Sequence, residues 1–261
     1  MKTLLEGLDE LGFSNLEGID VPQIDNADEE SDAMSEEAIA KMADCIYDKK
    51  FCCPVCDAHF TDKAVKSAKV RLLELDVDLM PKYTPLNPFY YNVVICTSCG
   101  YAALADNFDK LTEAQGFAIK KEISKKYLHK SYTFPLTESS AVERYKYTLL
   151  NTVVKKGRVS EMAYICLVIS WIYKIDEDEE NRRLFVGSAY KLFIEAFGKE
   201  SFPFFGLSET ATQYLIAELA WYLKDQESSK KWLSRVLSSR SSTSKVKELA
   251  LDLKNRITGQ P

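Results

Sequence analysis

The second half of the chain carries its apolar residues at helical spacing. From about Asp106 onward, apolar positions recur every three to four residues, and residues that can cap a helix stand before the apolar runs. Proline is absent from Leu136 to Phe202 and from Phe204 to Gln260, so no proline breaks a helix in these stretches. The pattern predicts helices that start near Thr112, Thr137, Ser160, Asp176, Ser208, Asp225 and Thr243.

A helix pair occurs twice in this half. Residues 164–174 align with residues 214–224 at a shift of 50 positions, and a charged turn and a second amphipathic helix follow each copy. The second copy resembles a tetratricopeptide repeat, because Leu223-Lys224-Asp225 stands where that family's turn usually reads Leu-Gly-Asp. The period exceeds that family's period of about 34 residues, which implies a longer second helix. A last apolar stripe from Val246 to Ile257 predicts a helix that caps the array.

The region from residue 51 to about residue 104 differs in kind from these helices. Two runs rich in β-branched and aromatic residues, Val70–Leu79 and Tyr90–Cys96, stand among four of the chain's eight prolines, which predicts a small β module. Ahead of it, Ser35 can cap a short helix that runs to about Tyr47. The predicted fold class is therefore α+β and mainly α.

Two Cys-x-x-Cys pairs carry the strongest chemical signal in the β module. Cys53 and Cys56 form the first pair, and Cys96 and Cys99 form the second, 39 residues later. Each pair places two sulfurs on one side of a tight turn, so two facing turns supply the four thiolates of a tetrahedral site. We expect structural Zn²⁺, with iron in the same four-thiolate cage as the alternative. Gly100 fits this picture, because a turn around a metal often needs a positive φ.

The other cysteines and a nearby histidine are weaker candidates. A thioredoxin-like redox motif needs one pair at a helix start in a βαβ context, which is missing here. We expect Cys52 to be a core or free thiol, and Cys45 and Cys166 to be small apolar core residues. His59 is either an additional donor at the metal site or a polar surface residue.

Two nearby carboxylates invite an enzymatic hypothesis. A strand over Leu72–Leu79 would place Asp76 and Asp78 on one face, where they could act in catalysis or hold a second metal. The simpler interpretation is that they pair with Lys69, Arg71 or a base from the helical half. The chain has two histidines, no Gly-rich phosphate loop and no HExxH motif, which favours a protein that is not an enzyme.

The N-terminus is strongly acidic. The first 50 residues hold fourteen acids and four lysines, and we expect residues 1–34 to be largely disordered. A short apolar motif from Leu4 to Val21 either packs on its own domain or docks into a partner's groove. The predicted domains are residues 1–34, a zinc-ribbon-like module with a preceding helix over 35–105, and a tetratricopeptide-like helical domain over 106–261.

An ordered series of short motifs lies in and between the cysteine pairs. The series is Cys53-Pro-Val-Cys56, Lys69-Val-Arg71, Asp76-Val-Asp78, Tyr83, Asn87-Pro88-Phe-Tyr90-Tyr91 and Cys96-Thr-Ser-Cys99-Gly-Tyr-Ala. With this series the chain resembles the bacterial domain of unknown function 2225 family, from about Phe51 to Ile257. The resemblance implies a zinc-ribbon-like module joined to tetratricopeptide-like helices, and it implies no activity.

These observations favour a non-enzymatic, zinc-binding adaptor that binds a protein or peptide partner through its helical array. We expect it to be cytoplasmic, because the chain lacks both a membrane-spanning run and a signal-peptide pattern. A nucleic-acid-binding zinc ribbon is one alternative and a thiol-based redox sensor is another. The net charge of -5 is weak support for nucleic acid. The bases that would serve nucleic acid are Lys63, Lys66, Lys69, Arg71, Lys120, Lys121, Lys125, Lys126 and Lys130.

Overall fold

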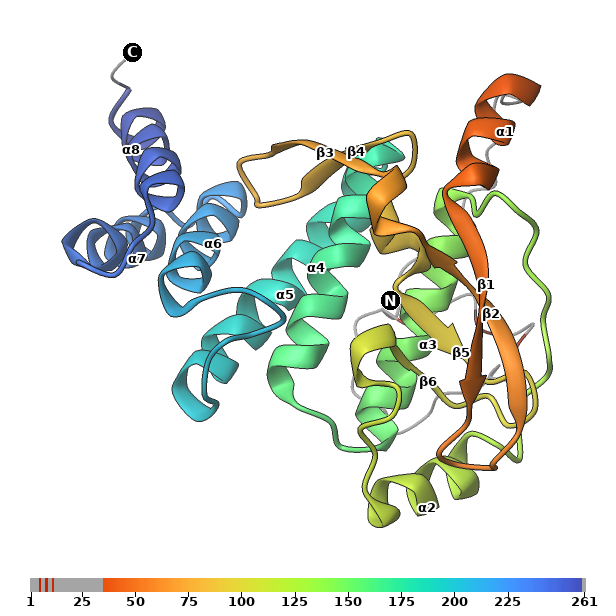
Figure 1. The fold of residues 1–261 in the computed structure, drawn as a ribbon. Helices are drawn as coiled ribbons and strands as arrows, with labels where there is room; N and C mark the ends of the chain where they lie inside the picture. The colour runs from red at the N-terminus through yellow and green to blue at the C-terminus, as the bar shows by residue number, and fades with distance from the viewer. Residues whose placement is uncertain (1–4, 6–7, 9–10, 12–34, 260–261) are drawn as a thin grey trace. The chain divides into compact units, whose positions relative to one another are not determined.

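The computed structural model describes Leu5, Leu8, Leu11 and residues 35–259 (Figure 1). Contacts within the chain group it into two compact units, which we describe separately. The first unit comprises residues 1–74, 82–157 and 175–177, and the second comprises 75–81, 158–174 and 178–261. The chain is mainly helical with small antiparallel strand pairs, which confirms the predicted fold class.

Two short hairpins of the first unit carry the cysteine pairs. Strand β1 (Ile46–Cys52) pairs antiparallel with β2 (His59–Val65), in a register that runs from Ile46↔Val65 to Cys52↔His59. Strand β5 (Val93–Ile95) pairs antiparallel with β6 (Ala102–Leu104). The turn of each hairpin contains one of the two Cys-x-x-Cys pairs.

A short helix precedes the first hairpin. Helix α1 (Glu36–Asp44) starts as predicted, because the Ser35 hydroxyl accepts a hydrogen bond from the Ala38 N–H. It ends three residues before the expected Tyr47. The predicted length is wrong because Ile46 and Tyr47 pair with β2 from the start of the hairpin, and this tertiary pairing overrides the local helical pattern.

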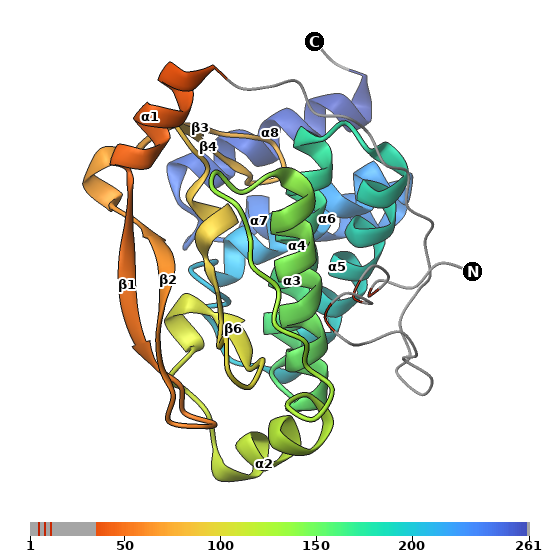
Figure 2. The same ribbon diagram turned by 90° about the vertical axis from the view of Figure 1, so that its right-hand side faces the viewer.

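Helices α2 (Glu113–Glu122) and α3 (Glu138–Val154) also belong to the first unit. Thr112 and Thr137 cap them, as the sequence predicted. Figure 2 shows β6 beside α3, and α3 packs against both β5 and β6. The predicted domain boundary near residue 105 stays a prediction, but the contacts group these two helices with the cysteine-bearing hairpins.

The described part of the N-terminal apolar motif packs on its own chain. Leu5, Leu8 and Leu11 are each 1% exposed. The Leu128 N–H donates a hydrogen bond of 3.0 Å to the Leu11 carbonyl oxygen. Of the two interpretations of this motif, packing on its own domain therefore has direct support. The rest of the acidic segment predicted over 1–34 lies outside the described residues.

The two apolar runs predicted as strands are only partly strands. Strand β3 (Arg71–Leu75) pairs with β4 (Pro81–Thr84), and the chain between them turns, with Leu79 at φ +62°. The expected strand over Leu72–Leu79 is therefore wrong beyond Leu75. The second run begins in the 3-10 helix η3 (Pro88–Tyr91), because Pro88 has no N–H for a strand ladder. Two further 3-10 turns, η2 (Ser67–Lys69) and η4 (Ala105–Asn107), complete the first unit.

Five helices make up most of the second unit, and their bounds follow the predicted pattern closely. Ser208, Asp225 and Thr243 are the N-caps of α6, α7 and α8. Helix α4 starts one residue before Ser160, and the N-cap of α5 is Asp178, two residues after the predicted start. The helices are α4 (Val159–Ile175), α5 (Glu179–Lys199), α6 (Glu209–Tyr222), α7 (Gln226–Ser238) and α8 (Ser244–Thr258).

These helices pack in chain order. The rings of Tyr173 in α4 and Phe185 in α5 lie 5.7 Å apart. Helix α5 packs against α6, α6 against α7, and α8 against both α6 and α7, as Figure 1 shows. Phe197 of α5 and Trp232 of α7 meet edge to face at 5.0 Å, which links alternate helices. Among the described residues, no helix is long and apolar enough to cross a membrane.

Candidate metal centre

The structure brings the four predicted cysteines together in the first unit. Their sulfur atoms all lie within 4.8 Å of one another, and none of the four is in a disulfide. The Sγ atoms of Cys53 and Cys99 are 3.6 Å apart, and those of Cys56 and Cys96 are 3.7 Å apart. Each close pair thus joins one hairpin turn to the other, so the cluster bridges segments about forty positions apart in the sequence.

The spacing of the sulfurs fits a tetrahedral metal. Zinc–sulfur bonds are about 2.3 Å long, so the edges of a ZnS₄ tetrahedron measure about 3.8 Å. The two short sulfur–sulfur distances of 3.6 and 3.7 Å are close to that edge. The donor set is therefore of the right kind and nearly the right size for zinc or iron in a four-thiolate cage.

The two cysteine turns share one backbone geometry. The Asp57 N–H donates to the Cys53 carbonyl and the Gly100 N–H donates to the Cys96 carbonyl, each at 2.9 Å. The donor in each turn is the residue after the second cysteine, and it has a positive φ, +59° at Asp57 and +72° at Gly100. The glycine was expected from the sequence. Asp57 was not, although aspartate is among the few non-glycine residues that tolerate this conformation.

Burial and hydrogen bonding set the charge of the cluster. Cys53, Cys96 and Cys99 are buried, while Cys56 is half-buried. Hydrogen bonds from Cys53 and Cys99 lower the pKa of the Cys96 thiol, because they stabilise its thiolate. Donating to Cys96 raises the pKa of Cys53. The neighbouring thiols thus favour the thiolate form of Cys96, the form in which a cysteine binds a metal.

Two side chains of helix α3 form hydrogen bonds with the backbone of the second cysteine turn and of the strand that follows it. The Tyr147 hydroxyl donates a 2.8 Å hydrogen bond to the Gly100 carbonyl, and the Asn151 side-chain oxygen accepts one from the Ala102 N–H at 3.1 Å. The Tyr127 ring stacks on Tyr147 with centroids 5.8 Å apart. A Cβ at Gly100 would lie 2.4 Å from the Tyr127 ring, so two tyrosines fill the space that a side chain here would need.

The remaining cysteines and His59 lie outside the cluster. Cys52 and His59 are exposed and face each other across the β1–β2 ladder. Cys45 and Cys166 are buried, as predicted for small core residues. Among the described residues only the four predicted cysteines gather closely enough to hold a metal through His, Cys, Asp or Glu.

A match to a family model identifies the proteins to which the chain is related. The family described as "Uncharacterized protein conserved in bacteria (DUF2225)" matches residues 46–257, which is most of the chain. The chain belongs to the DUF2225 family. This confirms the resemblance seen in the sequence, and the match spans both cysteine pairs and all five helices of the second unit. The comparisons with curated proteins and with solved structures found no match.

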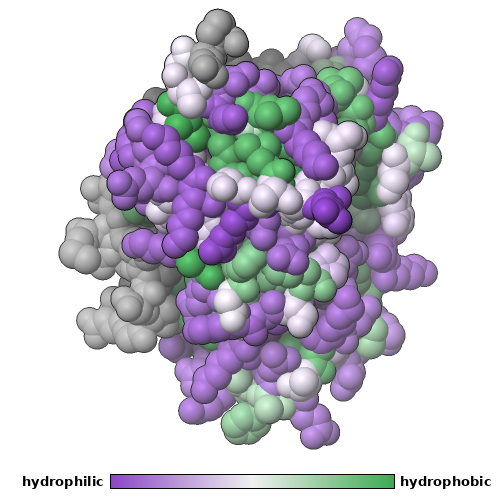
Figure 3. All heavy atoms as spheres, turned by 90° about the vertical axis from the view of Figure 1, so that its left-hand side faces the viewer, coloured by the Kyte–Doolittle hydropathy of each residue, from purple (hydrophilic) through white to green (hydrophobic). Residues whose placement is uncertain are grey.

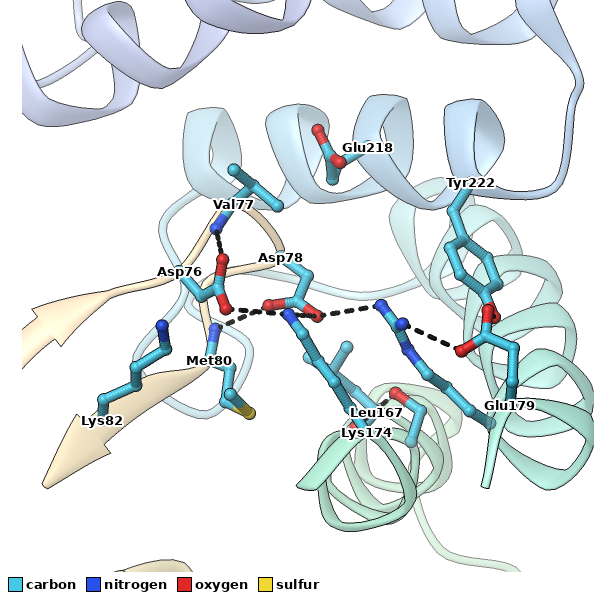
Figure 4. A network of polar contacts seen from close by, with 12 residues as sticks. Asp76, Val77, Asp78, Met80, Lys82, Leu167, Lys174, Glu179, Glu218 and Tyr222 are labelled. Atoms are coloured by element: carbon cyan, nitrogen blue, oxygen red, sulfur yellow. Dashed lines mark hydrogen bonds and ion pairs between the residues drawn. The ribbon is translucent and has the colours of Figure 1, made fainter. Parts of the chain in front are cut away.

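The second unit holds the two aspartates that suggested an enzyme. Asp76 and Asp78 lie in the turn after β3, and the Lys174 ammonium bonds a carboxylate oxygen of each at 2.9 Å (Figure 4). Arg182 of α5 lies 3.8 Å from Asp78. The Tyr214 hydroxyl donates to the Val77 carbonyl at 2.6 Å. The aspartates therefore pair with bases of the helical half, which was the simpler of the two interpretations.

A second ion pair in the same unit joins the buried Glu218 of α6 to Arg256 of α8, whose side chain is 37% exposed. The Arg256 guanidinium donates two hydrogen bonds to the Glu218 carboxylate, the longer one at 3.0 Å. Burial raises the pKa of Glu218, and the arginine partly offsets this effect. Nothing in the sequence pattern pointed to Lys174 or Glu218 as members of such a network, because each sits within an otherwise ordinary helical run.

Gly100→Ala tests the tight packing at the cysteine turn. The added methyl group would meet Tyr127 and Tyr147 and would occupy a positive φ, so we expect a loss of about 2–4 kcal/mol in the free energy of unfolding. The matched control is Gly198→Ala, where nothing lies within 4 Å of the new Cβ and the residue is within α5. There we expect a gain of up to about 1 kcal/mol. Urea unfolding measures both changes. Equal changes in the free energy of unfolding would contradict the tight packing of the tyrosines on Gly100.

Lys174→Met tests the charge network of the second unit. Two carboxylates would be left without their shared cation, and we expect a loss of about 3 kcal/mol in the free energy of unfolding. Lys199→Met removes one partner of an exposed pair with Glu195 and should cost no more than about 0.5 kcal/mol. Denaturant titration measures the free energy of unfolding of both variants. If the Lys174 variant is as stable as the Lys199 variant, the charge network contributes little to stability.

Proposed function

We propose that this protein is a non-enzymatic adaptor whose first unit is held rigid by a structural Zn²⁺. The observation that carries the proposal is the group of four sulfurs within 4.8 Å, presented by two turns of the same geometry. Four thiolates complete a tetrahedral coordination shell, so the metal has no open position for water or substrate. A site of this kind contributes folding free energy and leaves binding to other surfaces.

The second unit supports the partner-binding part of the proposal. Helices α4 to α8 follow one another in the order that two helix pairs and a terminal cap of a tetratricopeptide-like array would have. Arrays of this kind bind extended or helical peptides. On the face shown in Figure 3, hydrophobic residues reach the surface in patches between hydrophilic ones. On α8, the side chain of Leu251 is 52% exposed.

Nucleic-acid binding is the second candidate, and one surface favours it. Lys120, Lys125 and Lys126 are exposed on α2 and the turn that follows, with no ion-pair partner among the described residues. Phe117 of α2 is 71% exposed, and an exposed aromatic ring beside lysines can stack on an unpaired base.

A thiol sensor is the third alternative. Under mild peroxide, a sensor would release its metal and change its assembly state, whereas a structural site is expected to do neither.

Cys56→Ser tests the metal centre. We expect the purified wild-type protein to contain one zinc ion per chain and the variant to contain none, since three thiolates do not complete the site. Losing a contribution on the order of 10 kcal/mol should unfold the hairpins of the first unit, while the helices of the second unit remain. The matched control is Cys52→Ser, an exposed cysteine outside the cluster, which should keep both metal and stability. Equal metal content in the two variants would overturn the assignment.

Affinity purification of the tagged, full-length protein tests the adaptor role. After nuclease treatment, we expect a protein partner at near-stoichiometric amount, and we expect Leu251→Asp to weaken its recovery if the array's surface binds it. Replacing Lys120, Lys125 and Lys126 by Gln should leave that recovery unchanged. Recovery of nucleic acid that depends on these lysines and falls steeply with salt would instead favour the second candidate.

A further inference from the structure

A cavity of about 280 Å³ opens in the first unit beside the second cysteine turn. Ile95 and Thr97 form one wall, and Thr97 lies between the candidate ligands Cys96 and Cys99. The segment between α2 and α3 and Arg144 of α3 also line the cavity. The cavity is thus assembled from segments distant in the sequence, which is typical of a binding site built by the fold.

Positive charge dominates the lining of this cavity. Lys63, Lys130 and Arg144 line it, against Asp62 alone among the acidic residues. Arg144 pairs with Asp62 at 2.9 Å, but the partners of the two lysines, Asp48 and Glu143, are not part of the lining. The residues that line the cavity therefore carry more positive than negative charge, although each cation also has a carboxylate partner.

Arg144 is the most constrained of these cations. Its side chain is 7% exposed, and its Nη2 donates to Asp62 and to the Val93 carbonyl. Its Nε is buried and has no hydrogen-bond partner among the described residues. A buried donor without a partner costs free energy, so the guanidinium of this lining residue keeps hydrogen-bonding capacity that the described residues do not use. The Tyr132 ring lies 5.2 Å from the guanidinium carbon and holds it in place.

Aromatic and hydroxyl groups complete the lining. The rings of Tyr91, Tyr127 and Phe134 provide flat apolar surface, and the hydroxyls of Thr97 and Ser131 provide short-range hydrogen bonding. Ligand sites in proteins commonly combine such apolar walls with a few polar groups that fix orientation. The combination suits a molecule with a charged end and a flat or apolar body.

We propose that this cavity binds a small molecule that carries a carboxylate or phosphate group on an aromatic or apolar body. The anionic group lies against Arg144 and Lys130, where charge-assisted hydrogen bonds are strongest. The body packs between the tyrosine rings. Phosphate and carboxylate share this chemistry, and the probes below distinguish them.

The position of the cavity couples the ligand to the cysteine turn. Thr97 belongs to that turn, and Tyr127 lies against Gly100 next to Cys99. A ligand that holds these residues should slow the loss of metal from the turn, since whatever binds the folded form stabilises it. This coupling rests on the proposed metal centre, whereas ligand binding to the cavity does not. Measuring metal content and ligand affinity on the same sample therefore tests the metal centre and the ligand site separately.

Titration calorimetry of the full-length protein, with its metal content measured, tests the site. The probes are phenyl phosphate and benzoate, and benzamide is the neutral control. We expect one saturable site for at least one anionic probe, with benzamide bound at least about tenfold more weakly, because it lacks the charge. Absence of saturable binding of either anion up to about 10 mM would overturn the proposal, whatever the metal content.

Three variants localise the binding to the cavity. Lys130→Gln removes a lining cation and Ser131→Trp fills the space, and each should weaken the anionic probe at least about tenfold. Lys110→Gln removes an exposed lysine outside the cavity and should leave affinity unchanged. Arg144 is not chosen first, because its bonds to Asp62 and Val93 also support the fold. Affinity that is unchanged in Ser131→Trp, or lost equally in Lys110→Gln, would place the anion elsewhere and overturn the proposal.

Discussion

Four sulfur atoms draw together two hairpins that the chain makes about forty residues apart. Each hairpin is short: β5 and β6 have three residues each, and strands of that length are not stable alone. Burying thiols without a partner gains little, whereas a metal shared by four thiolates cross-links both turns at once. The proposed metal would fix both turns, and with them the hydrogen bonds of Asp57 in the first turn and Gly100 in the second, the tyrosines packed on Gly100 and the cavity beside Thr97.

The second unit uses a different physical device. Its helices bury apolar and aromatic side chains against their neighbours in chain order, and the buried carboxylates of Asp78 and Glu218 lie against basic side chains. Lys174 between Asp76 and Asp78, and Arg256 on Glu218, show how this unit pairs its carboxylates with basic side chains. Removing one partner of such a pair leaves a charge uncompensated, which costs more free energy than the intact pair contributes.

The sequence was a good guide where one local rule decided the outcome. Thr112, Thr137, Ser208, Asp225 and Thr243 cap helices as their side chains predict, and the two Cys-x-x-Cys spacings fixed the members of the cluster. Sequence reasoning failed where distant contacts decide. Pairing with β2 shortened α1, a turn replaced the expected strand after Leu75, and the groups around Arg144 come together only in the folded chain.

X-ray absorption at the metal edge of the purified, full-length protein tests the central claim most directly. The account predicts zinc surrounded by four sulfur atoms at about 2.3 Å, with no nitrogen or oxygen ligand. A histidine or water in the coordination shell, a different metal, or cysteines oxidised to disulfides without metal would contradict it. Any of these results would return the cysteine turns to the enzymatic or redox roles that a closed four-thiolate shell excludes.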